Sequence, residues 1–266
     1  MNQSLVNIHP EAKIAPNVEI QPFTTIDKNV IIGEGTKISS NVTILEGTRI
    51  GKNCRIFPGA VIGAIPQDLK FEGEETTVEI GDNTTIREYV TVNRGTKVRG
   101  KTVVGNNCLL MAYVHIAHDC IIGNNIILSN CVQIAGEVTI GDWAILGGCA
   151  AVHQFVKIGE HVMVRGGSLV AKDVPPYVKA VRDPITYAGI NSVGLRRRNF
   201  TNEQIYNIQK CYRVLFQSNL NITNALRKIE AELPASKERD DIIQFVKNSN
   251  RGIIKGYNSS VGQVDD

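Results

Sequence analysis

An aliphatic residue recurs at every sixth position over most of the chain. In the register that runs from Ile8 to Val170, 26 of 28 positions are isoleucine, leucine or valine, and the exceptions are Asp68 and Glu74. Four residues after each aliphatic residue stands a small or β-branched one, such as Thr24. An α-helix cannot sustain a period of six, and a meandering sandwich would alternate with period two. The pattern therefore predicts a solenoid of six-residue repeats.

Three repeats make one turn of a triangular coil, in which each side is a short strand paired with the strands one turn above and below. The aliphatic side chains fill the interior, and the turn residue that often follows directly, such as Gly33 or Gly51, is expected to form the corner. Each repeat buries its apolar face only against its neighbours. We therefore predict a mainly β fold, a left-handed parallel β-helix over residues 1–190. About nine turns at a strand spacing of ~4.8 Å would give a prism about 43 Å long.

Two segments interrupt this pattern, at about residues 63–79 and, more weakly, at 93–103. Both are expected to be loops that leave the prism. Loops on a rigid scaffold often carry function, so these two excursions are candidate parts of a site.

The six-residue pattern stops after Pro175-Pro176. The segment Thr201–Gln204 has the form of a capping box, and apolar residues then fall at helical spacing in three segments that begin near Ile205, Ile222 and Ile242. We predict a C-terminal helical domain over residues 191–256 that covers the open end of the prism, followed by a polar tail over 257–266.

Composition narrows the class of protein. No apolar run approaches the roughly 20 residues that span a bilayer, and the N-terminal segment does not resemble a signal peptide, so we expect a cytoplasmic protein with no integral membrane segment. A net charge of +3 is too small to indicate nucleic-acid binding. The six cysteines contain no CxxC spacing and are expected to be small buried residues in a reducing compartment.

Outward-facing histidines are the candidates for chemistry, because the interior of the prism is filled. His9 and His161 are expected to be ordinary surface residues. His115 and His118 flank an inward isoleucine, and His153 lies 35 residues after His118, close to two turns of 18 residues. His118 and His153 should therefore lie near the same edge.

Asp119 directly follows His118. A carboxylate beside an imidazole can orient the ring and stabilise the imidazolium, so the pair suggests a general base. The spacing alone leaves two other interpretations open, exposed histidines without a function and a zinc site that uses several histidines.

Five short segments together resemble the UDP-N-acetylglucosamine O-acyltransferases of lipid A biosynthesis. The matching segments are Gln67-Asp68-Leu69-Lys70, His115-Ile116-Ala117-His118-Asp119-Cys120, Ala151-Val152-His153-Gln154-Phe155, Asp173-Val174-Pro175-Pro176-Tyr177, and Asn191 followed by Gly194-Leu195-Arg196-Arg197-Arg198. The resemblance runs over most of the chain and is more specific than the repeat itself.

The resemblance implies an activity. Members of this family are homotrimers with active sites between subunits. They transfer an (R)-3-hydroxyacyl group from acyl carrier protein to the 3-hydroxyl of UDP-N-acetylglucosamine, with a histidine general base, no covalent intermediate, no cofactor and no metal.

The resemblance also implies roles for individual residues. His118 would be the base, Asp119 its partner, and the N–H of Gly136 the donor to the oxyanion. The residues implied to hold the sugar and diphosphate are Gln67, Asp68, Lys70, His115, His153 and Gln154. Those implied to reach the uridine and phosphates are Asn191, Arg197 and Arg198. Gly166 would limit the length of the acyl chain, and Met163 would line its channel.

Two features qualify and support the resemblance. Glu137 stands where studied members carry a histidine that touches substrate.

Near the junction of prism and helices the chain offers basic residues that could steer the acidic carrier protein, namely Arg165, Lys172, Lys179, Arg182 and Arg196-Arg197-Arg198. The three consecutive arginines are expected at a helix start, where the helix dipole would disfavour them and an anionic ligand would compensate.

Three alternatives remain. The related UDP-sugar N-acyltransferase usually carries an extra N-terminal domain before its repeats, whereas here the repeats begin at Ile8. A γ-type carbonic anhydrase would use three histidines around zinc. A non-catalytic scaffold would not need His118.

Overall fold

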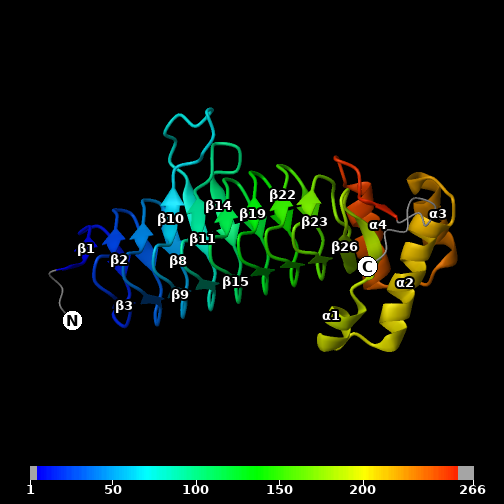
Figure 1. Cartoon of the computed structure of the whole chain (residues 1–266), viewed down its shortest axis with the longest axis horizontal. Helices are drawn as coiled ribbons and strands as arrows, with labels where there is room; N and C mark the ends of the chain where they lie inside the picture. Colours follow the sequence, from blue (N-terminus) through cyan, green and yellow to red (C-terminus); the bar gives the residue numbers. More distant parts are fainter. Residues whose placement is uncertain (1–4, 257–266) are drawn as a thin grey trace.

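The computed structural model describes residues 5–256 and shows a long three-sided prism of parallel strands with a group of helices at one end (Figure 1). The predicted left-handed β-helix and C-terminal helices are confirmed. The predicted polar tail, residues 257–266, lies outside the described residues. Each side of the prism is one sheet, and strands three apart in the sequence pair in register.

The first side contains β1 (Asn7–Ile8), β4 (Thr25–Ile26), β7 (Thr43–Ile44), β10 (Val61–Ala64), β13 (Thr91–Asn93), β16 (His115–Ile116), β19 (Gln133–Ile134), β22 (Ala151–Val152) and β25 (Leu169–Val170). The second side contains β2 (Lys13–Ile14), β5 (Ile31–Ile32), β8 (Thr48–Ile50), β11 (Thr77–Ile80), β14 (Lys101–Val104), β17 (Ile121–Ile122), β20 (Thr139–Ile140) and β23 (Lys157–Ile158). The third side contains β3 (Glu19–Ile20), β6 (Lys37–Ile38), β9 (Arg55–Ile56), β12 (Thr85–Ile86), β15 (Leu109–Leu110), β18 (Ile127–Leu128), β21 (Ile145–Leu146) and β24 (Met163–Val164), and continues into β26 (Val178–Val181), β27 (Thr186–Ile190) and β28 (Lys255–Gly256). We call the turn after each side the first, second and third corner.

The aliphatic residues of the six-residue register form the core. From Ile26 onwards nearly all of them are buried inside the prism. Val98 is an exception, with an exposed fraction of 63%, because it lies in the second excursion. The register predicted at Val98 is therefore wrong.

The corners are made by a different residue from the one predicted. The positive φ angles fall on the third residue after the aliphatic residue, as at Asn29 (φ 51°) and Asn53 (φ 54°). Gly33 has no positive φ and is needed for another reason. A Cβ atom at Gly33 would lie 2.7 Å from the carbonyl carbon of Gly51 in the next coil. These glycines let neighbouring coils stack closely and do not form the turn.

The cysteine prediction is wrong at two positions. Cys54, Cys108, Cys120 and Cys211 are buried, but Cys131 and Cys149 are exposed. Both exposed residues occupy the left-handed corner position, with φ angles of 62° and 59°. A side chain at that position projects outward from the prism.

Both excursions leave the prism at the first corner. The loop of residues 65–76 joins β10 to β11, and the loop of residues 94–100 joins β13 to β14. Figure 1 shows the two loops rising side by side from one edge of the prism. Lys97 N–H donates to Glu74 Oε1 at 2.9 Å, so the loops also brace each other.

The helical region contains α1 (Ser192–Arg197), α2 (Asn202–Gln217), α3 (Ile222–Glu232) and α4 (Lys237–Lys247). The predicted capping box is present at the start of α2, where Thr201 and Gln204 bond reciprocally. The hydroxyl of Tyr177 donates to Asp241 of α4 at 2.8 Å and ties the helices to the end of the prism. Within the described residues, no helix is long and apolar enough to cross a membrane.

The arginine run does not lie at a helix start. Arg196 and Arg197 are in the last turn of α1, where the partial negative charge of the helix end stabilises cations. The predicted conflict with the helix dipole is therefore absent, and it gives no argument for an anionic ligand.

Candidate active site

The first corner brings together most of the residues singled out from the sequence. His118 and Asp119 form the turn after β16, and both excursions leave the prism one and two coils earlier. Gly136 stands one coil further along in the position of His118, and Gln154 two coils further. His153 directly follows β22, so its predicted place on the same edge as His118 is confirmed.

His118 and Asp119 form a buried pair. His118 lies outside the wall of the prism, but only 7% of its surface is exposed, and Asp119 is fully buried. His118 Nδ1 is 2.8 Å from Asp119 Oδ2. Because an ionised carboxylate only accepts hydrogen bonds, this contact places a proton on Nδ1 and leaves Nε2 as the basic nitrogen.

The imidazole of His118 lies against the backbone of Gly136. A Cβ atom at residue 136 would be 2.5 Å from His118 Nε2, so only glycine leaves room for the ring in this position. Within residues 5–256 no hydrogen-bond acceptor receives the N–H of Gly136. Glu137 forms the left-handed corner (φ 60°), and its own N–H donates to the carbonyl of His118 at 2.9 Å.

The first excursion places a second carboxylate on the other side of the ring. Asp68 Oδ2 is 3.8 Å from His118 Nε2, and Asp68 Oδ1 accepts from the N–H of Lys70 at 3.0 Å. Gln67 and Lys70 are exposed. A hydroxyl group bound here would meet both the Nε2 nitrogen of His118 and a carboxylate oxygen of Asp68.

Two further histidines lie along the same edge. His115 Nδ1 is 2.7 Å from the hydroxyl of Thr91, and burial lowers the pKa of His115, which favours its neutral form. His153 is exposed, and its Nδ1 lies 3.1 Å from the carbonyl oxygen of Gln154. Both can still offer Nε2 to a ligand that runs along the corner.

The second corner holds a separate cluster around His161, and the prediction that His161 is an ordinary surface residue is wrong. Its exposed fraction is 8%, and its ring stacks between Trp143 and Tyr177 with centroid separations of 6.4 and 5.6 Å, with Phe200 edge-on at 5.0 Å. Trp143 precedes His161 by one repeat of 18 residues. That spacing was the signal in the sequence that could have paired the two rings.

His161 holds two of the residues assigned to the nucleotide. Its carbonyl accepts from Asn191 Nδ2 at 2.9 Å, and its Nδ1 lies 3.3 Å from Arg198 Nη1. Arg198 also lies over the ring of Trp143, at 5.2 Å from the centroid. Arg197 is exposed on α1. Burial, and then the charge of Arg198, lower the pKa of His161 to about 4.

The third side carries the residues assigned to the acyl chain. Met163 ends a ladder of partly buried, outward-facing apolar residues on four successive coils, which also contains Leu109, Ile127 and Ile145. Gly166 is exposed at the third corner. A Cβ atom there would lie 3.0 Å from the carbonyl oxygen of Gly148, which is tight but open on the outer side.

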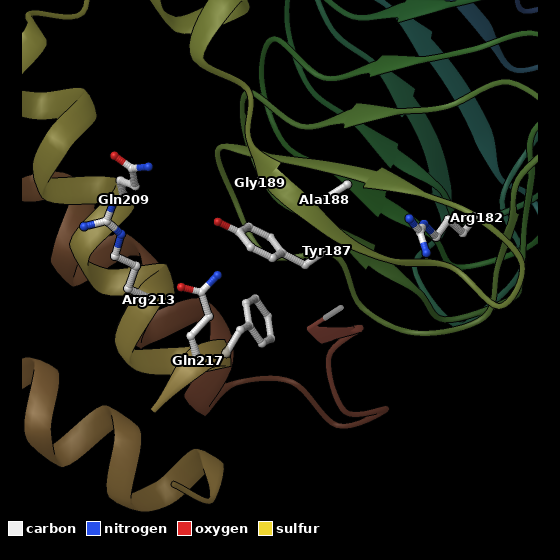
Figure 2. Close-up of a pocket in the computed structure, with 8 residues that line it drawn as sticks. Arg182, Tyr187, Ala188, Gly189, Gln209, Arg213 and Gln217 are labelled. Carbon is white, nitrogen blue, oxygen red and sulfur yellow. The ribbon is translucent and has the colours of Figure 1, made fainter. Parts of the chain in front are cut away.

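A cavity of about 340 Å³ lies between β27 and α2, away from the first corner (Figure 2). Figure 2 shows the hydroxyl of Tyr187 pointing toward the side chains of α2. The lining residues are Arg182, Tyr187, Ala188, Gly189, Gln209, Arg213, Phe216 and Gln217. Two of these lining residues are arginines.

Comparison with known proteins assigns the family. The model described as "Udp N-acetylglucosamine O-acyltransferase; Domain 2" matches residues 173–254, and the bacterial transferase hexapeptide model matches residues 101–136. The acyl-(acyl-carrier-protein)–UDP-N-acetylglucosamine O-acyltransferase of Chlorobaculum tepidum is 58% identical over 75% of this chain and 76% of that protein, and the one of Aquifex aeolicus is 59% identical over 74% and 76%. The chain belongs to the UDP-N-acetylglucosamine O-acyltransferase family.

Solved structures of this family agree with the whole described fold. The UDP-N-acetylglucosamine acyltransferase of Bacteroides fragilis shares 57% identity and a TM-score of 0.94 over 96% of this chain and 100% of that one. The acyltransferase of Francisella novicida shares 44% identity and a TM-score of 0.93 over 97% and 95%. The resemblance drawn from the five segments is confirmed. In the described part of the chain, no group of three or more His, Cys, Asp or Glu residues is arranged to hold a metal ion.

The structure adds contacts at the site that the sequence did not reveal. Thr96 and Arg99 of the second excursion bond to the Asp119 carboxylate. Hydroxyl and backbone donors in a loop carry no pattern of their own, so only the fold shows what they contact.

The neutral His161 predicts a pH-dependent stability. In the unfolded chain a histidine has a pKa of about 6.5. Because the folded-state pKa is lowered to about 4, the unfolded state binds an extra proton as the pH falls through this window, and stability is lost from pH 6.5 to pH 4. The thermal midpoint of the wild type should therefore fall more steeply there than that of His161→Phe.

Phenylalanine suits this control because Phe23 and Phe155 already occupy the same left-handed corner position, with φ angles of 64° and 69°. Above pH 7 the two midpoints should run parallel. Differential scanning calorimetry from pH 4 to 8 measures both. Parallel curves over the whole range would mean that His161 is protonated equally in the folded and unfolded states.

Proposed function

We propose that this protein transfers an (R)-3-hydroxyacyl group from acyl carrier protein to the 3-hydroxyl of UDP-N-acetylglucosamine, with His118 as general base and without a covalent intermediate. The observation that carries the proposal is the buried His118–Asp119 pair, whose Nε2 lies between Gly136 and Asp68 at an edge open to ligand. Relatives that are 58% and 59% identical over about three quarters of their length bear names that state UDP-N-acetylglucosamine as acceptor and acyl carrier protein as donor.

The geometry suggests how the residues would act. His118 Nε2 takes the proton of the sugar 3-hydroxyl while the oxygen of that hydroxyl attacks the thioester carbonyl carbon of the donor. The N–H of Gly136 then donates to the oxyanion of the tetrahedral intermediate. When that intermediate collapses, the C–S bond breaks and the imidazolium returns its proton to the departing thiolate.

Cys120 is the thiol next to the pair, and it is a poor candidate for a nucleophile. It is fully buried, its Sγ contacts the carbonyl of Ala135 at 3.1 Å, and burial raises its pKa to about 12. A thiol in that state is not ionised at pH 7. This supports direct attack by the sugar hydroxyl.

The residues assigned to the base, the nucleotide and the acyl chain lie at different corners of one chain. His118 is at the first corner, Arg198 at the second, and Gly166 at the third. A rigid prism cannot fold these edges together, so a common site needs a neighbouring subunit. We therefore propose a homotrimer in which each site lies between two chains.

The end of the prism near the helices would receive the carrier protein. Arg165, Lys179 and Arg182 are exposed there. The cavity of Figure 2 adds Arg213 to this basic surface. An acidic partner would be steered toward such a surface, and its association rate would fall with rising salt.

Replacement of His118 tests the base directly. His118→Ala should lower kcat by roughly 10²- to 10⁴-fold, the range for a lost general base, while the trimer stays folded because the ring packs outside the prism. The assay is mass analysis of the product formed from UDP-N-acetylglucosamine and hydroxyacyl carrier protein. A loss smaller than about tenfold would point to another base, and His153 would be the first one to examine.

Mixed trimers test the shared site. His118→Ala and Arg197→Ala should each give weakly active homotrimers. If His118 and Arg197 come from neighbouring chains, co-expression at equal levels should restore about a quarter of the wild-type sites, because one in four interfaces pairs two intact halves. Sedimentation checks the trimer, and mixtures no more active than their parents would place both residues in one chain's site.

Gly166 tests the acyl channel. A methionine side chain reaches about as far as one coil spacing of ~4.8 Å, so Gly166→Met should shift the preferred donor to chains shorter by about four carbons. The affinity for the UDP-sugar should stay nearly constant. Gly166→Ala is the matched control, because it adds the same Cβ atom against Gly148 without the length. Competition between donors of graded length measures the shift, and an unchanged optimum for Gly166→Met would place the limit elsewhere.

A further inference from the structure

The Asp119 carboxylate is an unusual group for the outside of a prism, because it is fully buried. Oδ2 accepts from the Thr96 hydroxyl at 2.7 Å and from His118 Nδ1 at 2.8 Å. Oδ1 accepts from the N–H groups of Thr96 and Arg99 at 3.0 and 3.2 Å. A buried charge is stable only when its oxygens are paired in this way. All of these donors except His118 come from the second excursion.

The Thr96 hydroxyl has a fixed direction. It accepts from the N–H of Val98 at 3.2 Å, so its own hydrogen is available to Asp119. The loop around it is closed by the N–H of Gly100, which donates to the Thr96 carbonyl at 2.7 Å. The N–H groups of Val98 and Gly100 thus fix both the hydroxyl and the carbonyl of Thr96, so that Thr96 can fix the position of the Asp119 carboxylate.

The corner is fixed from the other side as well. The Asp119 N–H donates to the Thr102 hydroxyl at 2.8 Å, and the Asp119 carbonyl accepts from Arg99 Nη1 at 3.0 Å. Asp119 has a φ of 58°, a conformation that Asp tolerates better than most residues. The backbone and the side chain of Asp119 are therefore both placed by residues 96–102.

We propose that Thr96 is a positioning residue of the acyl transfer: its hydroxyl and N–H hold the Asp119 carboxylate where it orients His118 Nδ1. This rests on the proposed function, since it assumes that His118 is the base. The Thr96 hydroxyl and His118 share one oxygen, so the direction of the hydroxyl sets where that oxygen, and with it the imidazole, can lie. The second excursion then serves the chemistry without touching substrate.

Thr96→Val tests this with little change of shape, because valine keeps the branched Cβ and loses the hydroxyl. We expect kcat to fall roughly 10- to 100-fold, as for other outer partners of a catalytic group, with KM for UDP-N-acetylglucosamine changed by no more than about twofold. Thr96→Ser keeps the hydroxyl and should recover at least about a third of wild-type kcat.

Thr36→Val is the matched control. The Thr36 hydroxyl also donates once and accepts once, to Gly51 O at 2.9 Å and from Cys54 N at 3.1 Å, but far from the first corner. Removal of the Thr36 hydroxyl should leave kcat unchanged. Sedimentation reports whether each variant is assembled, and Thr96→Ala is measured in its place if Thr96→Val does not assemble.

Three results would overturn the proposal. They are an unchanged kcat in the variants without the hydroxyl, a Thr96→Ser enzyme as slow as Thr96→Val, and a change confined to KM. The double variant with His118→Ala separates this proposal from the function itself. If Thr96 acts through His118, the double variant is no slower than His118→Ala. If His118→Ala is itself fully active, the assignment of the base fails, whatever Thr96 does.

Discussion

The structure depends on the stacking of one coil on the next. Each coil pairs its strands only with the coils above and below, and its aliphatic residues pack only inside that column. Every residue therefore has a fixed place, set by its position in the repeat of 18. Gly33 shows how strict this is, since even one methyl group would meet the backbone of the next coil. Because strands cannot be interrupted without breaking the column, inserted loops leave at corners, and here both leave at the first.

That constraint decides what the corner chemistry requires. A corner residue projects outward, so Asp119 would be solvated if nothing covered it. The second excursion covers it, and then must supply donors, because an unpaired buried carboxylate costs several kcal/mol. Thr96 and Arg99 supply them. The first excursion rests on the second through Glu74 and carries Asp68 to the other ring nitrogen of His118. The prism fixes where His118 stands, and the loops fix its surroundings.

The period of the sequence was enough to predict the fold and the shared edge of His118 and His153, because both follow from counting along a rigid repeat. The period was not enough to predict features that depend on the residues that pack over the outside of the prism. His161 is buried because Phe200 and Tyr177 of the C-terminal region close over it, and no spacing within the repeat contains that information. The corner position was also misassigned, since glycine serves close stacking here while Asn29 and Asp119 take the left-handed angle. Cys131 and Cys149 also occupy the left-handed corner position, which explains why they are exposed although the sequence predicts them to be buried.

The first corner, which holds Asp119, and the second corner, which holds Arg198, differ in how their charges are paired. This difference suggests that the two corners have different functions. At the first corner the buried charge is the Asp119 carboxylate, whose oxygens are occupied by His118 and the second excursion, so this carboxylate orients the imidazole of His118. At the second corner the half-buried charge is the guanidinium of Arg198, and burial lowers its pKa. Its partners in the described chain are a neutral imidazole and an indole ring, neither of which compensates the charge. A desolvated cation with neutral neighbours gains most from an anion that arrives with a ligand. The second corner is thus suited to binding negative charge and the first to moving a proton, which is the arrangement that the proposed site between two chains requires.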